Sequence, residues 1–236
     1  MGPWAHPYGA HLLCRSPGSI SPPAIAASLR IGRSATRNMR MPADGSATKA
    51  AFRADAMARR DALSPQARAA ASAAIAERTI AIAEKLKPAV IAAYRAIRSE
   101  VDPDAIVDWA LAKDIVVVLP AVSDAATLVF RRYRPGDALA AGGFGTLSPP
   151  RGAPEIDPDL VVSPMVAFDR SGTRLGHGRG FYDRCMWALR ARGLSPTLLG
   201  VGFSVQEVAA IPAEPHDVRM DFIVTEKETL DFRRFG

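Results

Sequence analysis

The sequence predicts an α/β protein of three layers, with a mainly parallel, Rossmann-like sheet flanked by helices in a single domain. Segments with helical spacing alternate with short apolar runs along the chain. The run at 115–119 contains only Ile, Val and Leu, which is typical of a strand buried on both faces of a parallel sheet. The chain has 236 residues, 48% of them hydrophobic, which is enough for one sizeable core. No apolar stretch approaches the ~18 residues of a membrane-spanning helix, so none is expected.

Two helices are predicted where the regular pattern begins. Residues 48–61 have helical spacing and carry several basic side chains. Ser64 suits the N-cap of a second helix, and Pro65 suits its first position, where a missing N–H does no harm. A basic last turn and Pro88 mark its end. One stripe of this helix is expected to face the core, because four side chains recur at helical spacing: Ile75, Thr79, Ile82 and Leu86.

Helices and strands alternate in the rest of the chain. Asp102 and Pro103 open a third helix, and a fourth is predicted between Phe181 and Arg192. Adjacent arginines in the run at 128–133 place that strand nearer a sheet edge. The predicted strands, in chain order, are 90–94, 115–119 stopped by Pro120, 128–133, 160–162 ending at Pro164, 198–203, and 222–224 as the last.

The first 43 residues are predicted to lie outside the folded domain, which spans 44–236. They are rich in Pro, Gly, Ser and Arg and show no helical or strand period, which is typical of disorder. One origin is an organellar transit peptide, which is also rich in arginine and poor in acidic residues. The other, which we prefer, is a mis-assigned start, with Met39 or Met41 as the true first residue. No signal-peptide pattern is found, so secretion is not expected.

Charge and cysteine content narrow the function classes. Five of the 30 Lys and Arg residues lie in residues 1–43, so the rest of the chain holds 25 basic and 24 acidic residues. A near-neutral net charge in this part of the chain argues against a surface that binds the phosphate backbone of nucleic acid. Cys14 and Cys185 cannot form a disulfide framework or, by themselves, a four-cysteine zinc site, and they fit a reducing, cytoplasmic compartment. Neither nucleic acid nor a membrane is expected as a partner.

The strongest chemical signal is the segment 174–184, in which Gly176, Gly178 and Gly180 alternate directly before a predicted helix. Glycine permits positive φ and a close approach of backbone amides to a ligand. The helix N-terminus supplies free N–H groups and a positive dipole end. Two flanking arginines add guanidinium forks that suit phosphate oxygens. The segment predicts a polyphosphate cradle, although it matches neither the Walker motif nor G-x-G-x-x-G. A glycine-rich turn without a ligand is the alternative.

Four more polar residues are candidates for the same site. Asp183 comes near the start of the predicted helix, where it either stabilises the helix dipole or holds Mg²⁺ beside phosphates. Asp217 precedes the last predicted strand and is a second candidate carboxylate. Lys49 and Arg53 are four residues apart, so they share one helix face and can reach one anion. The alternative for this pair is an exposed basic face.

These residues together resemble the 5-formyltetrahydrofolate cyclo-ligase (5,10-methenyltetrahydrofolate synthetase) family. The likeness covers roughly residues 48–226 and is most specific at 174–184. The weaker matches, in family order, are Lys49-x-x-x-Arg53, Glu100-Val101-Asp102, Phe144-Gly145 with Pro149, Gln206, Pro212 and His216-Asp217. The resemblance implies an enzyme that uses ATP and Mg²⁺ to convert 5-formyltetrahydrofolate to 5,10-methenyltetrahydrofolate. A monomer is expected.

The resemblance also implies the roles of single residues. The expected ATP contacts are Lys49, Arg53, Arg174, Leu175, Gly176, His177, Gly178, Arg179, Gly180, Phe181 and Tyr182. The expected catalytic residues among them are Arg174, Arg179 and Tyr182. The expected folate contacts are Glu100 and Arg95, and the expected Mg²⁺ ligands are Asp183 and Asp217. By local sequence alone, Glu100 is equally well explained as a loop or helix-start charge.

Besides Arg95, where a less polar residue is usual, three positions depart from the family pattern. His177 occupies a variable loop position, and Phe181 replaces the commoner tyrosine, which keeps a ring but removes its hydroxyl. A glutamate often found just before Pro149 is missing. None of these changes removes an expected phosphate or metal ligand. The rival hypotheses are a non-catalytic folate- or nucleotide-binding protein of the same fold, and a phosphate-binding isomerase or transferase on a similar sheet.

Overall fold

The computed structural model describes residues 45–123, 127–142 and 145–233. The expectations for residues 1–43, for a domain start at 44 and for Phe144 lie outside these ranges. The main helices are α1 (Gly45–Asp61), α2 (Pro65–Leu86), α3 (Asp104–Ala112) and α4 (Phe181–Ala191), and a short 3-10 helix, η2, spans Ser204–Gln206. Within the described ranges, no helix is both long and apolar enough to cross a membrane.

A seven-stranded sheet forms the centre of the fold, in the order β11-β10-β9-β6-β1-β2-β3. Among these strands, only the outer two, β3 and β11, pair antiparallel with their neighbours, and the others pair in parallel. The predicted sheet type is therefore confirmed, as is the edge position of the strand at 128–133. The strand bounds are Val90–Ala92 (β1), Val116–Val122 (β2), Leu128–Tyr133 (β3), Leu160–Pro164 (β6), Thr197–Val201 (β9), Phe222–Val224 (β10) and Thr229–Asp231 (β11).

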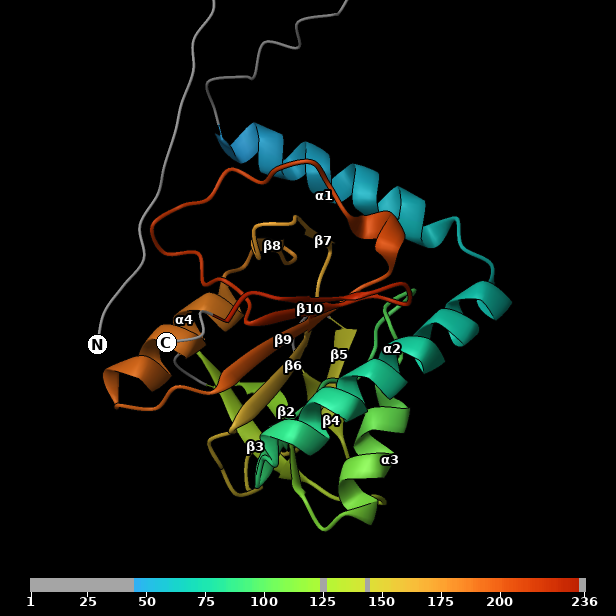
Figure 1. Cartoon of the computed structure of the whole chain (residues 1–236). Helices are drawn as coiled ribbons and strands as arrows, with labels where there is room; N and C mark the ends of the chain where they lie inside the picture. Colours follow the sequence, from blue (N-terminus) through green and yellow to red (C-terminus); the bar gives the residue numbers. More distant parts are fainter. Residues whose placement is uncertain (1–44, 124–126, 143–144, 234–236) are drawn as a thin grey trace, which may run out of the picture. The chain divides into compact units, whose positions relative to one another are not determined.

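Helices cover both faces of this sheet, α2 and α3 on one and α4 on the other (Figure 1). Ile75 of α2 is fully buried in a cluster that contains Val117 of β2. On the opposite face, Met186 of α4 belongs to a cluster that contains Val118 of β2. Successive residues of a strand point to opposite faces, so β2 serves both clusters. A strand buried on both faces, as predicted from the apolar run, is confirmed.

The first helix packs on a small hairpin beside the main sheet. This hairpin consists of β7 (Ala167–Phe168) and β8 (Arg174–Leu175), which pair antiparallel. Ala56 of α1 shares an apolar cluster with residues from both hairpin strands, Ala167 and Leu175, and α1 lies next to the hairpin in Figure 1. The helix from the start of the domain is thereby held over the segment that leads into the glycines.

Several strand predictions are wrong in detail, and the strands predicted at 90–94 and 198–203 end earlier, at Ala92 and Val201. The second strand does not stop at Pro120 but continues to Val122. Its neighbour β1 ends at Ala92, opposite Val118, so beyond that point β2 has a strand on one side only, where proline is tolerated. The strand at 222–224 is not the last, because β11 follows it in a hairpin. The hairpins β7–β8 and β4–β5 (Ala140–Gly142 and Thr146–Ser148) were not predicted, since strands of two or three residues leave no period to detect.

Candidate functional site

The glycine-rich loop, residues 176–180, connects β8 to α4. Gly178 and Gly180 have φ of +88° and +62°, a left-handed conformation that residues with side chains rarely adopt. Gly180 is the N-cap of α4, so the loop ends at a helix N-terminus, where the first N–H groups have no partner within the helix. The positive φ predicted from the alternating glycines is present at two of the three positions, and Gly176 does not need it.

Arg53 of α1 contacts this loop directly. Its Nε donates a hydrogen bond to the carbonyl oxygen of Gly176 at 2.8 Å. A Cβ atom on Gly178 would lie 3.5 Å from the guanidinium carbon of Arg53, an ordinary contact distance. Arg53 therefore lies within van der Waals contact of Gly178, and a basic group from the start of the domain reaches the predicted phosphate site.

Lys49, one turn earlier on α1, is held by two carboxylates. Its Nζ lies 2.8 Å from Oδ2 of Asp217 and 3.0 Å from Oε1 of Glu214, and its side chain is 8% exposed. Burial disfavours the charged forms, but the hydrogen-bonded ion pairs outweigh it. The pKa of Lys49 is therefore raised and the pKa of Asp217 is lowered. Lys49 and Asp217 thus stay charged over a wide pH range.

Arg174 of β8 joins Asp183 to the segment that follows Asp217. Its Nη2 lies 3.1 Å from Oδ1 of Asp183, and its Nη1 donates to the carbonyl oxygen of Val218 at 2.5 Å. The N–H of Val218 donates to the same Asp183 oxygen at 3.1 Å. The third residue of α4 therefore lies next to the Asp217 segment. The Arg174 side chain, 8% exposed, is committed to internal partners and orients Asp183.

Glu100 contacts the glycine-rich loop through His177. Its side chain is 4% exposed, and its Oε1 lies 3.2 Å from Nε2 of His177. Its Oε2 accepts a hydrogen bond from the N–H of Ile97 at 3.1 Å. The predicted folate carboxylate and the predicted ATP loop are therefore in direct contact, through His177.

Four aromatic and basic residues lie where the loop meets α4: Arg179, Phe181, Tyr182 and Arg184. Burial raises the pKa of Tyr182, with a further contribution from the negative charge of Glu100, so its phenol stays protonated near neutral pH. The guanidinium of Arg184 lies 5.2 Å from the ring centre of Phe181. Arg179 is exposed on the loop. The phenol of Tyr182 can therefore donate a hydrogen bond near neutral pH.

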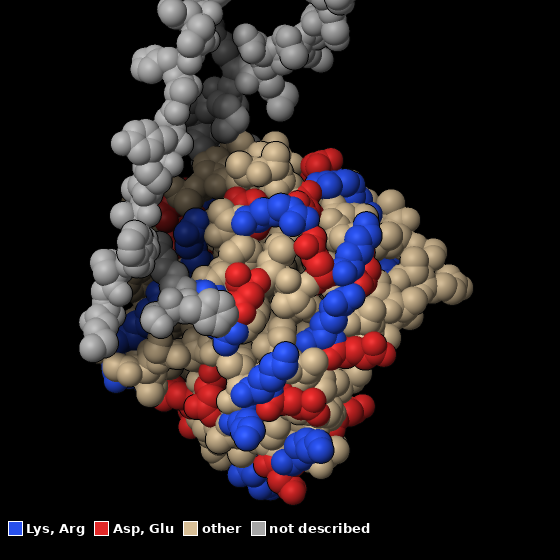
Figure 2. All heavy atoms as spheres, in the orientation of Figure 1, with Lys and Arg blue, Asp and Glu red and all other residues tan. Residues whose placement is uncertain are grey.

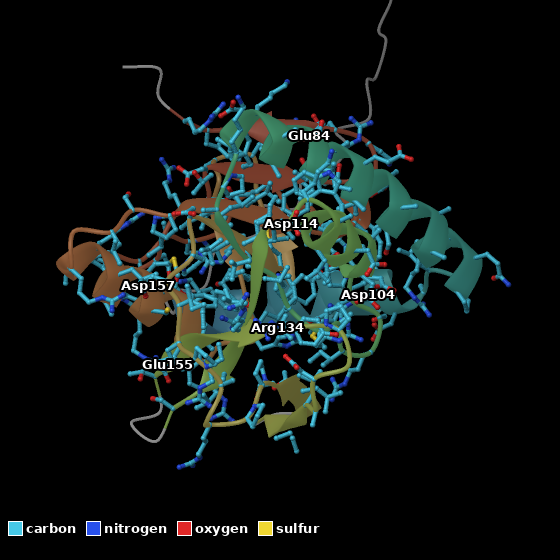
Figure 3. The ribbon with its side chains drawn as sticks, turned by 90° about the horizontal axis from the view of Figure 1, so that it is seen from below. Glu84, Asp104, Asp114, Arg134, Glu155 and Asp157 are labelled. Atoms are coloured by element: carbon cyan, nitrogen blue, oxygen red, sulfur yellow. The ribbon has the colours of Figure 1, made fainter. Side chains whose placement is uncertain are left out.

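Arg95 is placed differently from the other predicted residues. Its Nη1 lies 2.8 Å from Oδ1 of Asp104, in the first turn of α3. Asp104 is labelled in Figure 3, at the start of that helix. Among the described residues, Arg95 has no hydrogen bond or ion pair with the glycine-rich loop. The structure thus directs its guanidinium to α3.

Sequence reasoning missed Glu214 and the backbone of Val218. Glu214 and Asp217 both form ion pairs with Lys49. The sequence feature that could have pointed to Glu214 is the neighbouring His216-Asp217 pair. Together, Glu214, His216 and Asp217 offer ligand atoms that lie within 4.8 Å of one another. Acidic and basic groups are interspersed here, as they are over the face drawn in Figure 2. Val218 acts through main-chain atoms, which carry no sequence signal.

The fold and this site define a class: an α/β protein with a glycine-rich loop at a helix N-terminus, an arrangement that suits an anion. A model of the 5-formyltetrahydrofolate cyclo-ligase family matches residues 45–226. A 5-formyltetrahydrofolate cyclo-ligase of Mycolicibacterium smegmatis is 37% identical over 155 residues, which cover 62% of this chain and 78% of the relative. One from Haemophilus influenzae is 28% identical over 154 residues, which cover 63% and 81%.

A solved structure has the same fold. The 5,10-methenyltetrahydrofolate synthetase of Aquifex aeolicus aligns with a TM-score of 0.68 at 28% identity, over 80% of this chain and 94% of that one. The chain belongs to the 5-formyltetrahydrofolate cyclo-ligase family. The resemblance inferred from the glycine-rich segment and its companion motifs is therefore confirmed, together with the expectation of a ligase of folate metabolism.

Proposed function

We propose that the chain converts 5-formyltetrahydrofolate to 5,10-methenyltetrahydrofolate at the expense of ATP, with Mg²⁺, and releases ADP and phosphate. Family membership supports the folate substrate and the overall reaction. One observation carries the nucleotide part of the proposal. Lys49 and Arg53 bind Asp217 and the glycine-rich loop across 168 and 123 positions of sequence, so the cationic, glycine and carboxylate groups gather at one place.

The reaction requires an activated formyl group. The N5-formyl group is an amide, so its carbon is a weak electrophile and its oxygen is a poor leaving group. In the proposed sequence the formyl oxygen attacks the γ-phosphorus of ATP, and the bond from that phosphorus to the ADP oxygen breaks. N10 of the same folate adds to the formyl carbon and loses its proton. The C–O bond then breaks, and inorganic phosphate leaves. Because no enzyme nucleophile is needed, the chain acts by positioning and charge stabilisation.

The triphosphate is proposed to bind between α1 and the glycine-rich loop. The N–H groups at the start of α4 and the ammonium of Lys49 offer hydrogen-bond donors to phosphate oxygens. Arg53, already bonded to the carbonyl of Gly176, places a guanidinium beside the loop. These donors are fixed before the reaction, so charge that develops on the transferred phosphoryl group is stabilised without reorganisation of the site.

Asp183 and Asp217 would hold Mg²⁺. Magnesium prefers oxygen ligands and is commonly bound by one or two carboxylates together with phosphate oxygens. In their protein contacts Asp183 uses Oδ1 and Asp217 uses Oδ2, so each has a second carboxylate oxygen of the required type. The donor set therefore fits the ion. When bound, Mg²⁺ would supply neutralisation of the phosphate charge.

The folate is proposed to bind on the Glu100 side of the loop. A buried carboxylate suits the N–H donors at the edge of a pterin ring. His177, which now contacts Glu100, would share that carboxylate with the substrate. The protonated phenol of Tyr182 can donate a hydrogen bond but cannot act as a base near neutral pH.

A direct assay tests the proposal. Purified chain is mixed with ATP, MgCl₂ and 5-formyltetrahydrofolate, and the near-ultraviolet absorbance of the methenyl product is followed together with ADP. We expect equal amounts of both products and no methenyl product when ATP or Mg²⁺ is omitted. Calorimetric binding of both ligands by a folded chain that forms no product would favour the non-catalytic binding protein. Product formed at the same rate without ATP would contradict the phosphorylation step.

A further inference from the structure

Arg60, near the end of α1, is a buried cation to which the proposed reaction assigns no role. Its side chain is 1% exposed. Its Nε donates to Oγ of Ser99 at 3.0 Å and lies 3.7 Å from a carboxylate oxygen of Asp61. Its Nη1 and Nη2 have no hydrogen-bond partner among the described residues. A guanidinium buried with so few partners costs free energy, so packing alone is a poor explanation for it.

The Ser99 side chain links Arg60 to another residue of the chain. The Ser99 hydroxyl accepts the hydrogen bond from Arg60 and donates one to Oδ1 of Asp61. A hydroxyl has one proton to donate, so these two contacts fix the rotamer of Ser99. The residue that follows is Glu100, the carboxylate that meets His177.

Ser99 and Glu100 end a tight turn at 97–100. The N–H of Glu100 donates to the carbonyl oxygen of Ile97 at 3.2 Å, and the N–H of Ile97 donates to Oε2 of Glu100 at 3.1 Å. Arg98, inside the turn, has φ of +54°, a left-handed conformation that is strained for a residue with a side chain. A strained segment keeps its shape only where its surroundings hold it. The bond from the buried Arg60 to Ser99 is a contact of this kind from the protein interior.

We infer that Arg60 is a positioning residue for the folate site: through Ser99 it fixes the turn that presents the carboxylate of Glu100. The inference rests on the proposed function, because it takes Glu100 as a folate contact. By this inference, α1 contributes to both the proposed ATP site and the proposed folate site. Lys49 and Arg53 at its start face the phosphate region, and Arg60 at its end supports the folate carboxylate.

Two variants test the role of Arg60. Ser99→Ala removes only the hydroxyl that receives the bond, and Arg60→Met removes the guanidinium. In steady-state assays of the full chain, each should raise the KM for 5-formyltetrahydrofolate at least tenfold and leave the KM for ATP within twofold of the wild-type value. Arg59→Met is the matched control. Arg59 donates a hydrogen bond to the carbonyl oxygen of Glu207 and not to Ser99. The Arg59→Met variant should therefore leave both KM values unchanged.

The outcomes separate a positioning role from a merely structural one. An unchanged folate KM in Ser99→Ala overturns the inference. So does an equal rise of both KM values accompanied by a lower Tm in both variants, since that result indicates general loss of structure. Arg60→Lys, which keeps the charge and a hydrogen-bond donor group, should recover part of the folate KM that Arg60→Met loses. If the wild-type chain binds folate but forms no product, the proposed function fails, and the same comparison is made with calorimetric Kd values for folate and ATP.

Discussion

Replacing Gly178 with alanine tests whether the left-handed loop backbone is needed for nucleotide binding. Gly178 has φ of +88°, and a Cβ there would lie 3.5 Å from the Arg53 guanidinium carbon, an ordinary contact distance. The main penalty is therefore in the backbone, where a left-handed conformation costs a residue with a side chain roughly 1–2 kcal/mol. If the loop relieves this strain by changing shape, the binding-competent population falls roughly 5- to 30-fold. We expect the KM for ATP to rise by that factor.

Gly193→Ala is the matched control for this prediction. Gly193 follows α4 and has φ of +79°, and nothing lies within 4 Å of its would-be Cβ. It therefore carries a similar backbone penalty outside the site. Both variants should lower Tm by about 2–8 °C, measured by differential scanning calorimetry. Only Gly178→Ala should change the KM for ATP. A wild-type value in Gly178→Ala, or an equal rise in Gly193→Ala, would refute the assignment of the loop to phosphate binding.

Four further predictions concern the charged groups of the site. Lys49→Met should weaken ATP binding roughly 10- to 150-fold, the value of one charged hydrogen bond, in calorimetric titrations. The lowered pKa of Asp217 stabilises the folded chain above pH 3.8, and this stability is lost as the pH falls through the pKa of Asp217 in the folded state. The raised pKa of Lys49 stabilises the folded chain below pH 10.5, and this stability is lost as the pH rises through the pKa of Lys49 in the folded state. Thermal melts at both pH extremes, with Lys49→Met as reference, should show both losses. Glu100→Gln should raise the KM for folate roughly tenfold and leave that for ATP unchanged, since a neutral acceptor replaces a charged one. Arg174→Ala should lower kcat/KM roughly 10- to 100-fold because Asp183 loses its orienting partner, and an unchanged kcat/KM in a folded variant would count against this role.

Elements that depend on local pattern were predictable from the sequence. Helix α2 begins after Ser64, whose Oγ accepts a hydrogen bond from the N–H of Ala67 at 3.1 Å, and it starts with Pro65, as expected. Caps and helical spacing act within a few residues, so their signal is local. The end of β2 was not predictable in the same way. Whether Pro120 interrupts a strand depends on which neighbour lies beside it, and β1 stops before that point.

The sequence by itself determined the chemistry available to this protein: a glycine-rich segment before a helix, and basic and acidic residues suited to phosphate and magnesium. Only the tertiary structure decided which of these groups meet. Lys49 reaches Asp217, and Arg53 reaches Gly176, because α1 packs on the β7–β8 hairpin, and such long-range packing leaves no local pattern. Arg60 is the clearest case. As an arginine it would be expected at the surface, and its burial against Ser99 follows entirely from how α1 packs against the turn before Glu100.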